Sequence, residues 1–282
     1  KVSYPLANMP YPFAGSSATI DSTAITALMR YKLPNNFSAI GGLRIQRASG
    51  KADLNVYSTL AGAYLPYSLR TSTETDLGYV IGVAWEKPEI AARVALTYNS
   101  KITHDFTATE TFMGGPAPGT GNTFETVSPE SVNLEFQTGI AKDTLLMGSV
   151  RWVHWTQFEI APDGYRATIG GGDPGAAGAL VAYSNNTTSW NIGVGRKFNE
   201  QWSGAVMFGY EKHQGGTTGN LGPTDGYKSV SLAASYKASD NVKITGGVRY
   251  VKIGDATTNP PTLADFSGNS GWGAGVRVGI SF

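Results

Sequence analysis

The chain ends in Trp272-Gly-Ala-Gly-Val-Arg-Val-Gly-Ile-Ser-Phe282, in which apolar residues alternate with glycine, serine and one arginine. Successive side chains of a strand point to opposite faces, so the apolar set from Trp272 to Phe282 would share one face. The other face would carry the glycines and Arg277. The stretch therefore predicts a strand that suits hydrocarbon on one side and tolerates water and a charge on the other.

The same alternation recurs upstream, in segments 242–254, 229–236, 202–211 and 92–101. In each segment aliphatic and aromatic residues oppose serine, threonine, asparagine, lysine or arginine. An arginine facing lipid near mid-membrane would cost about 2 to 4 kcal/mol, so this segregation has an energetic reason. A soluble sandwich strand can show the pattern once, but its recurrence with aromatic ends is typical of a transmembrane β-barrel. We therefore predict an all-β fold, a transmembrane antiparallel β-barrel.

Composition agrees with a single barrel domain over residues 1–282. Only 15% of the residues are charged, against about 25% in a usual soluble protein, and the chain contains 36 glycines, 14 tyrosines and 6 tryptophans. The net charge of +1 gives no reason to expect a nucleic-acid partner. The chain has no cysteine, which excludes disulfides and thiolate metal sites. No apolar run reaches the roughly 18 residues of a transmembrane helix.

Connections between the predicted strands alternate in length. Short turns are expected at residues 34–36, 87–89, 142–143, 199–200 and 239–241. Long loops are expected at residues 55–76, 108–129, 159–188, 212–227 and 255–271. Short turns at one rim and long loops at the other are the asymmetry of an outer-membrane barrel, with the short turns periplasmic. We count about twelve strands.

Two sequence blocks carry a family resemblance. Arg93-Val-Ala-Leu-Thr-Tyr98 and Trp155-Thr-Gln-Phe158, together with the order of the hairpins around them, resemble the FadL/TodX family of outer-membrane transporters for long-chain fatty acids and other hydrophobic compounds. The resemblance implies a 14-stranded barrel with an N-terminal hatch. The hatch, its Asn-Pro-Ala motif and about the first two strands are absent from this sequence. We expect the 282 residues to be part of a longer chain, and a naturally hatchless variant is the alternative.

The resemblance also implies a function. It predicts passive uptake of hydrophobic molecules, most of all long-chain fatty acids, that leave sideways through the barrel wall. The exit would lie at a kinked strand that maps to residues 3–12, where Pro5, Pro10 and Pro12 cannot donate ladder hydrogen bonds. An ordinary loop is the alternative for this segment. A structural or adhesive barrel and a general porin for polar solutes are the alternative functions.

The expected loop 57–69 is unusually apolar for exposed sequence. Exposed apolar patches mark binding or membrane contact, so we predict a ligand-landing site there, with a second wall from the next long loop. The predicted ligand-binding residues are Leu60, Tyr64, Leu65, Tyr67, Leu69, Phe112 and Met113. Packing of these side chains against one another, as a cap on the barrel, is the alternative.

Cationic side chains on the predicted lumen face could meet a carboxylate head group or pair with lumen acids. They are Arg44, Arg93, Lys101, Arg151, Arg249 and Arg277. No enzyme motif is present: His104, His154 and His213 are far apart in sequence, and His104 and His154 are expected at the barrel rim. The run Gly170-Gly-Gly-Asp-Pro-Gly175 is interpreted as a loop. We predict a monomer in the outer membrane of a Gram-negative bacterium that needs no cofactor, contacts lipid and lipopolysaccharide, and binds a fatty acid, hydrocarbon or detergent.

Overall fold

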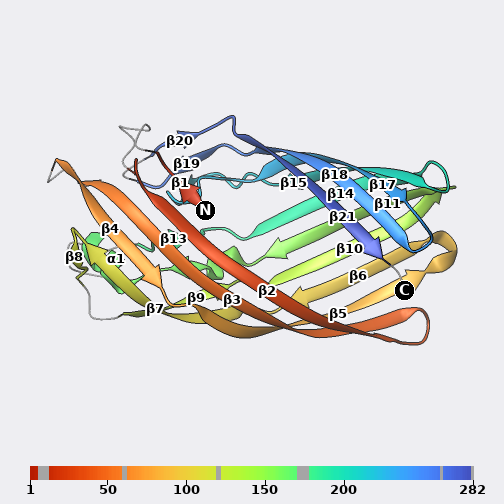
Figure 1. Cartoon of the computed structure of the whole chain (residues 1–282), viewed down its shortest axis with the longest axis horizontal. Coiled ribbons are helices and arrows are strands. Elements are labelled where there is room, and N and C mark those ends of the chain that lie inside the picture. The colour runs from red at the N-terminus through yellow and green to blue at the C-terminus, as the bar shows by residue number, and fades with distance from the viewer. Residues whose placement is uncertain (6–12, 59–61, 119–121, 170–177, 261–262, 281–282) are drawn as a thin grey trace.

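A long antiparallel sheet forms the wall of the molecule in the computed structural model, which describes residues 1–5, 13–58, 62–118, 122–169, 178–260 and 263–280 (Figure 1). The largest sheet contains 16 strands. Its long members, in wall order from β21 to β2, are β21 (Ser270–Ile280), β18 (Val242–Ile253), β17 (Tyr227–Lys237), β15 (Trp202–Glu211), β14 (Thr187–Lys197), β11 (Thr144–Val153), β10 (Ser131–Ala141), β6 (Ala92–Asn99), β5 (Glu74–Lys87), β3 (Phe37–Ser58) and β2 (Ser17–Lys32). Neighbouring long strands pair antiparallel, as the sequence predicted for a β-barrel.

Short elements complete the chain. They are β1 (Val2–Ser3), β4 (Ala63–Thr71), β7 (Ile102–Phe112), β8 (Gly115–Pro116), β9 (Thr123–Ser128), β12 (Glu159–Ile160), β13 (Val181–Ala182), β16 (Thr217–Thr218), β19 (Ala256–Thr258), β20 (Asp265–Phe266), helix α1 (Asp163–Ile169) and the 3-10 turns at Pro88–Ile90 and Trp155–Gln157. No helix among the described residues is long and apolar enough to cross a membrane.

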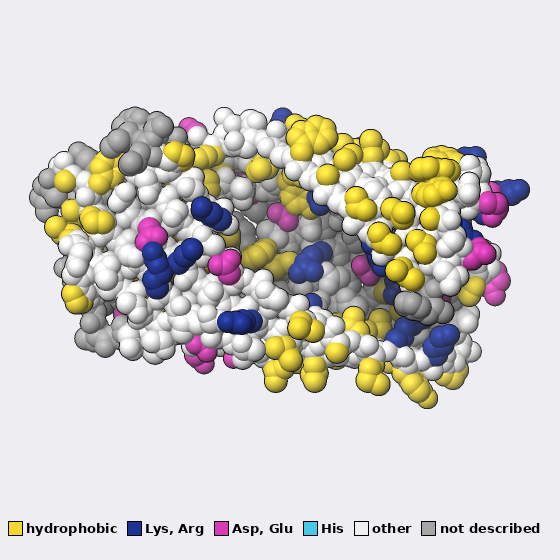
Figure 2. Space-filling view, in the orientation of Figure 1, with side chains coloured by type: hydrophobic (Ala, Val, Ile, Leu, Met, Phe, Trp, Pro, Cys, Tyr) yellow, Lys and Arg dark blue, Asp and Glu magenta, His cyan; other side chains and the backbone are white. Residues whose placement is uncertain are grey.

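The register of the wall confirms the predicted alternation. Trp272 lies opposite Tyr250, and Val276 lies opposite Gly246 on the same outer face, where Trp272 and Val276 are each 77% exposed. Arg277 lies opposite Thr245 on the inner face. Apolar side chains gather over the half of the outer surface nearest the short turns, and the interior is hollow (Figure 2). This apolar belt includes Ile25, Met29, Leu43, Ile45, Leu77, Ile81, Val83, Leu96, Trp190, Ile192, Phe208, Leu232 and Val278.

The predicted short turns lie at one rim of the wall. Asn35, Asn36, Ala91 and Asp143 adopt positive φ angles there, a conformation that lets a strand reverse in few residues. Two of the predicted long loops, 55–76 and 108–129, are different from the expectation, because much of their sequence is strand. β3 continues to Ser58 and pairs with β4 from Lys51 opposite Arg70 to Ser58 opposite Ala63. These hairpins extend the wall beyond the apolar belt.

β7 leaves the wall and lies against its inner face. Its first half pairs with β9, from Ile102 opposite Ser128 to Thr107 opposite Thr123, and its second half pairs with β4. Ile102, His104 and Phe106 are buried. A side chain at Gly78 of β5 would collide with Ile102, so this glycine permits the close approach of β7 to the wall.

The two outermost wall strands, β2 and β21, do not pair with each other. Within the described residues β2 pairs with β3 along one side and with β1 on the other, where only Ser17 and Ala18 take part. The edge of β2 from Thr19 onward therefore carries no strand partner in the part of the chain that the structure describes. This unpaired edge borders the hollow interior.

Candidate functional site

An apolar pocket lies between the inner faces of β2 and β3 and the β7/β9 hairpin. Its volume is about 90 Å³. The walls are predominantly apolar and include Ala18, Ile20, Ala48, Gly50, Ala52, Leu69, Phe106, Phe124, Phe158, Ile160, Leu180 and Leu221. Several of these residues belong to a buried cluster around Leu54, Tyr67 and Leu69 beneath the long connections. The pocket is therefore the part of the interior best suited to an apolar ligand.

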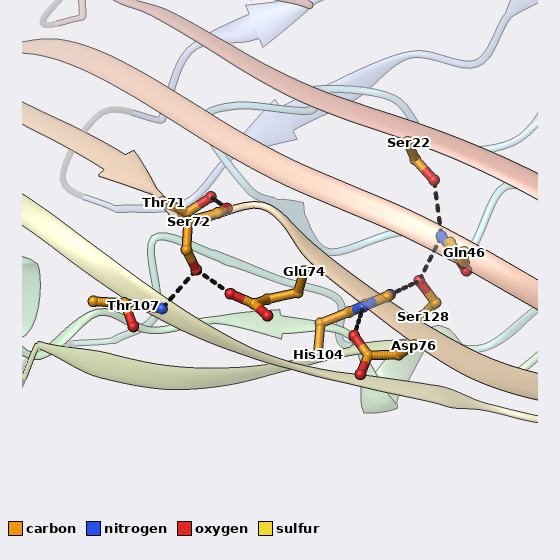
Figure 3. A network of polar contacts seen from close by, with 9 residues as sticks. All are labelled: Ser22, Gln46, Thr71, Ser72, Glu74, Asp76, His104, Thr107 and Ser128. Carbon is orange, nitrogen blue, oxygen red and sulfur yellow. Dashed lines mark hydrogen bonds and ion pairs between the residues drawn. The ribbon is translucent and has the colours of Figure 1, made fainter.

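A chain of hydrogen bonds closes the pocket on the side facing the short turns (Figure 3). The Gln46 side-chain amide donates to Ser22 Oγ at 2.8 Å and to Ser128 Oγ at 3.0 Å. His104 Nε2 lies 3.4 Å from Ser128 Oγ, and His104 Nδ1 lies 2.7 Å from Asp76 Oδ2. We call Ser22, Gln46, Ser128, His104 and Asp76 the floor. It connects the edge strand β2 to β5 through the β7/β9 hairpin.

A second set of hydrogen bonds holds the middle of β7 to the turn between β4 and β5. The Thr107 backbone N–H donates to Ser72 Oγ at 2.9 Å, and Ser72 Oγ donates to the Glu74 carboxylate (Figure 3). Thr71 Oγ1 accepts from the Gly50 backbone N–H at 2.8 Å. These bonds hold β3, β4 and β7 at fixed separations around the pocket.

Glu110 of β7 anchors helix α1 over the other end of the interior. Its carboxylate accepts hydrogen bonds from the backbone N–H groups of Gly164 at 3.1 Å and Tyr165 at 2.7 Å, and from the Tyr67 hydroxyl at 2.5 Å. The rings of Tyr67 and Tyr165 meet edge to face at 5.4 Å. Burial, followed by the hydrogen bond to Glu110, holds the pKa of Tyr67 far above its usual range.

The raised pKa of Tyr67 predicts a loss of stability at alkaline pH. An unfolded tyrosine ionises near its ordinary pKa of 10.0, whereas folded Tyr67 keeps its proton, so unfolding becomes more favourable as pH rises above that value. Tyr67→Phe should lower the free energy of unfolding by about 1.5 kcal/mol at neutral pH through the lost hydrogen bond. Its thermal unfolding in detergent should also depend less on pH between 9 and 11 than that of the wild type. An equal dependence in both proteins would contradict this assignment.

The residues predicted for the landing site lie in different surroundings. Leu69 lines the pocket, and Tyr67 is buried behind it at 3% exposure. Phe112 packs against the buried cluster, Tyr64 and Leu65 are half-buried, and Met113 is 63% exposed. Leu60 lies outside the described residues, as do residues 6–12 of the predicted kinked strand. A ligand contact by these residues stays a prediction.

The predicted lumen cations differ in their partners. Arg93 pairs with Glu86 at 3.1 Å, and Arg30 pairs with the same carboxylate at 2.6 Å. Arg44, Arg151 and Arg249 instead donate to neutral oxygens, those of Thr26 and Asn99, of Asn133, and of Ser229. Arg277 lines the vestibule, a cavity of about 1250 Å³ at the short-turn rim. Lys101 is exposed in the connection between β6 and β7.

The expectation that His104 and His154 lie at the rim is wrong for His104, which is 1% exposed. His154 pairs with Glu130 at 2.9 Å, and His213 pairs with Asp225 at 3.0 Å with a largely exposed side chain. No group of three or more His, Asp or Glu side chains that could hold a metal occurs among the described residues.

A family model described as outer membrane protein transport protein (OMPP1/FadL/TodX) matches residues 6–278. A FadL homologue from Pseudomonas aeruginosa has a similar structure, with a TM-score of 0.65 at 17% identity over 93% of this chain and 66% of that one. The toluene transporter TodX from Pseudomonas putida gives a TM-score of 0.59 at 12% identity, with 87% and 67% covered.

The monoaromatic hydrocarbon channel CymD gives a TM-score of 0.52 at 12% identity over 85% of this chain and 73% of that one. This chain spans 66% of the length of the FadL homologue, about two thirds. No curated protein sequence matches it significantly. At these identities the structural likeness concerns the fold, and the match to the family model concerns nearly the whole chain.

Proposed function

Because the chain belongs to the outer-membrane transport protein family OMPP1/FadL/TodX, we propose that it takes up small hydrophobic molecules by passive diffusion. The family is one of outer-membrane transport proteins in Gram-negative bacteria and not of enzymes. Uptake of this kind needs no covalent step, only a sequence of apolar sites that a ligand can enter and leave.

The pocket beside β2 is the observation that carries the proposal. It is apolar, and the floor closes it toward the rest of the interior. A hydrocarbon gains about 0.8 kcal/mol for each CH₂ group that leaves water, so the pocket is favourable for it. The interior beyond the floor carries Arg44 and Arg151 and is unfavourable for the same molecule.

The size of the pocket favours a ligand with a single ring over the long-chain fatty acid that the sequence suggested. A cavity of about 150 Å³ is enough for benzene, and sites for drug-sized ligands measure about 300 to 1,000 Å³. The pocket of about 90 Å³ must widen to about 150 Å³ for one ring and several-fold for a long acyl chain. The likeness to a toluene transporter and a monoaromatic hydrocarbon channel supports this choice.

The apolar residues on the inner face of β2 support a sideways exit. Ile20 lines the pocket, and Ala24 and Leu28 share its face of β2, with Ile20 and Leu28 each more than half exposed toward the interior. A ligand leaving sideways beside Ile20, at the level of the pocket, does not have to cross the floor at Ser22 or pass Arg44.

We also propose that the protein acts as a monomer, with its apolar belt in contact with outer-membrane lipid and lipopolysaccharide. The exposed aliphatic and aromatic side chains of the belt suit that environment.

Uptake measurements test the function directly. Cells that lack their own hydrophobic-compound channels should take up labelled toluene several times faster when the full-length gene is supplied, and labelled oleate should enter at the background rate. Immunodetection in outer-membrane fractions controls for assembly. Uptake of oleate but not toluene would restore the fatty-acid assignment, and uptake of neither by the assembled protein would overturn transport of hydrophobic molecules.

A further inference from the structure

Two lysines face each other on the outer surface of the wall, at the end farthest from the short turns. Lys228 lies directly opposite Lys252 in the pairing of β17 with β18, and both side chains are exposed. Lys252 shares its face of β18 with Tyr250, whose ring packs on that of Trp272 with the centroids 4.9 Å apart. Directly opposite residues have Cβ atoms about 5 Å apart, so both ammonium groups can reach one place on the surface.

The described part of the chain provides no counter-ion for this lysine pair. None of the ion pairs found there includes Lys228 or Lys252. The neighbouring acidic residues have other positions or partners. Glu211 lies on the inner face of β15, Asp225 is buried and pairs with a histidine, and Asp255 accepts a hydrogen bond from a backbone N–H group. Like charges directly opposite each other destabilise a strand pair.

The other end of the same hairpin is built differently. Lys237 and Lys243 are also directly opposite each other there. Asp240, in the turn between the two strands, pairs with Lys237 at 2.6 Å. The protein thus supplies its own anion at the short-turn end and, among the described residues, none at the opposite end. An anion from the surroundings would relieve the repulsion between Lys228 and Lys252.

The position of the lysine pair indicates the source of that anion. The short turns of an outer-membrane barrel are periplasmic, so the opposite ends of the strands lie at the outer leaflet. Tyr210 lies beside Lys228 on the outer face, and Tyr210 and Trp272 border the apolar belt there. Aromatic side chains of this kind lie at the level of the lipid head groups. Long lysine stems can carry their charges outward from this border to the phosphates of the head groups.

From this geometry we propose that Lys228 and Lys252 bind a phosphate group of lipid A, the anionic anchor of lipopolysaccharide in the outer leaflet. Leu232 and Val248, directly opposite each other and 55% and 47% exposed, continue the same face toward the middle of the belt. The acyl chains of the bound lipid A would lie along them. The site rests on the proposed contact of the belt with lipopolysaccharide. It is independent of hydrocarbon uptake, which uses the pocket inside the wall.

Thermal unfolding of the full-length protein in detergent, at increasing concentrations of purified lipid A, tests the site. A lipid that binds the folded protein raises its melting temperature, and the rise gives the affinity. Lys228→Gln and Lys252→Gln should each weaken lipid A binding about fivefold, and the double glutamine variant should weaken it at least tenfold. The double arginine variant keeps both charges and should bind as the wild type does. Lys87→Gln is the matched control, because Lys87 is exposed on the outer face at the short-turn end of β5.

A second comparison uses only the wild-type protein and stays decisive where a glutamine variant does not fold. Dephosphorylated lipid A should bind at least tenfold more weakly than lipid A, and equal binding of the two would overturn the site. Equal affinity of the wild type and a folded double glutamine variant for lipid A would overturn it as well. Phosphatidylglycerol or inorganic phosphate that binds as tightly as lipid A would exclude lipopolysaccharide as the specific ligand. Loss of toluene uptake with intact lipid A binding would count against the proposed uptake alone.

Discussion

Replacement of Gly50 by leucine is expected to reduce toluene uptake at least tenfold. Gly50 lines the pocket, and a Cβ there would meet Thr71 Cγ2 at 3.7 Å and Thr19 O at 3.9 Å, which are ordinary contacts. The backbone therefore accepts the leucine, whose remaining carbons extend into a pocket of about 90 Å³. A six-carbon ring excluded from the pocket loses a burial worth up to about 5 kcal/mol, given about 0.8 kcal/mol for each carbon group.

Gly41→Leu is the matched control for this variant. Gly41 lies on the same strand but faces lipid, opposite Ile81 and Met29, and has no atom within 4 Å of a Cβ position. Its uptake of toluene should equal that of the wild type. Labelled toluene uptake and direct binding to the purified variants provide the two measurements. Equal losses in both variants, or full activity in Gly50→Leu, would show that the pocket is not on the uptake route.

The wall of the molecule was predictable because two different media act on its two faces. Trp272, Val276 and Val278 face outward and Arg277 faces inward, as the alternation of residues 272–282 indicates. This signal repeats in each long strand, and turn residues such as Asn35 and Asp143 mark where the strands reverse. Sequence patterns of period two are sufficient for that part of the fold.

The long connections were less predictable, because their strands pack on protein rather than lipid. Their content of glycine, proline and threonine indicated loops, yet β3 and β4 continue as a paired hairpin. The face of β7 that carries Ile102, His104 and Phe106 has the same period of two, and this signal could have identified His104 as buried. A single histidine in so short a segment is weak support for a strand.

The pocket itself could not be predicted from sequence. Its walls come from residues as far apart as Ala18 and Leu221, and they meet because β7 and β9 lie inside the wall. No sequence motif predicts that the β7/β9 hairpin packs against the inner face of the wall. The family resemblance predicted a ligand site among the long connections. Of the residues predicted for that site, Leu69 lines the pocket.

The floor provides the second large expected effect. Asp76→Leu removes the acceptor of the buried His104 Nδ1–H, which lies 2.7 Å from the Asp76 carboxylate. An unpaired buried donor costs about 1 to 3 kcal/mol, and the lost bond had a charged acceptor, so we expect the free energy of unfolding to fall by about 3 kcal/mol. The melting temperature in detergent should decrease, and toluene should bind less tightly because one of the contacts that fix β7 to β5 is lost.

The double variant Asp76→Leu with His104→Phe should recover most of the lost stability. Phenylalanine has a ring of similar size, and position 104 already packs beside Phe106, with ring centroids 5.7 Å apart. Replacing both partners of a buried hydrogen bond by apolar groups is often nearly neutral, whereas removing one partner is not. A thermodynamic cycle over the two single variants and the double variant should therefore give a coupling energy of about 1 to 3 kcal/mol. Additive effects would mean that His104 and Asp76 do not depend on each other, and that the floor does not hold the pocket closed.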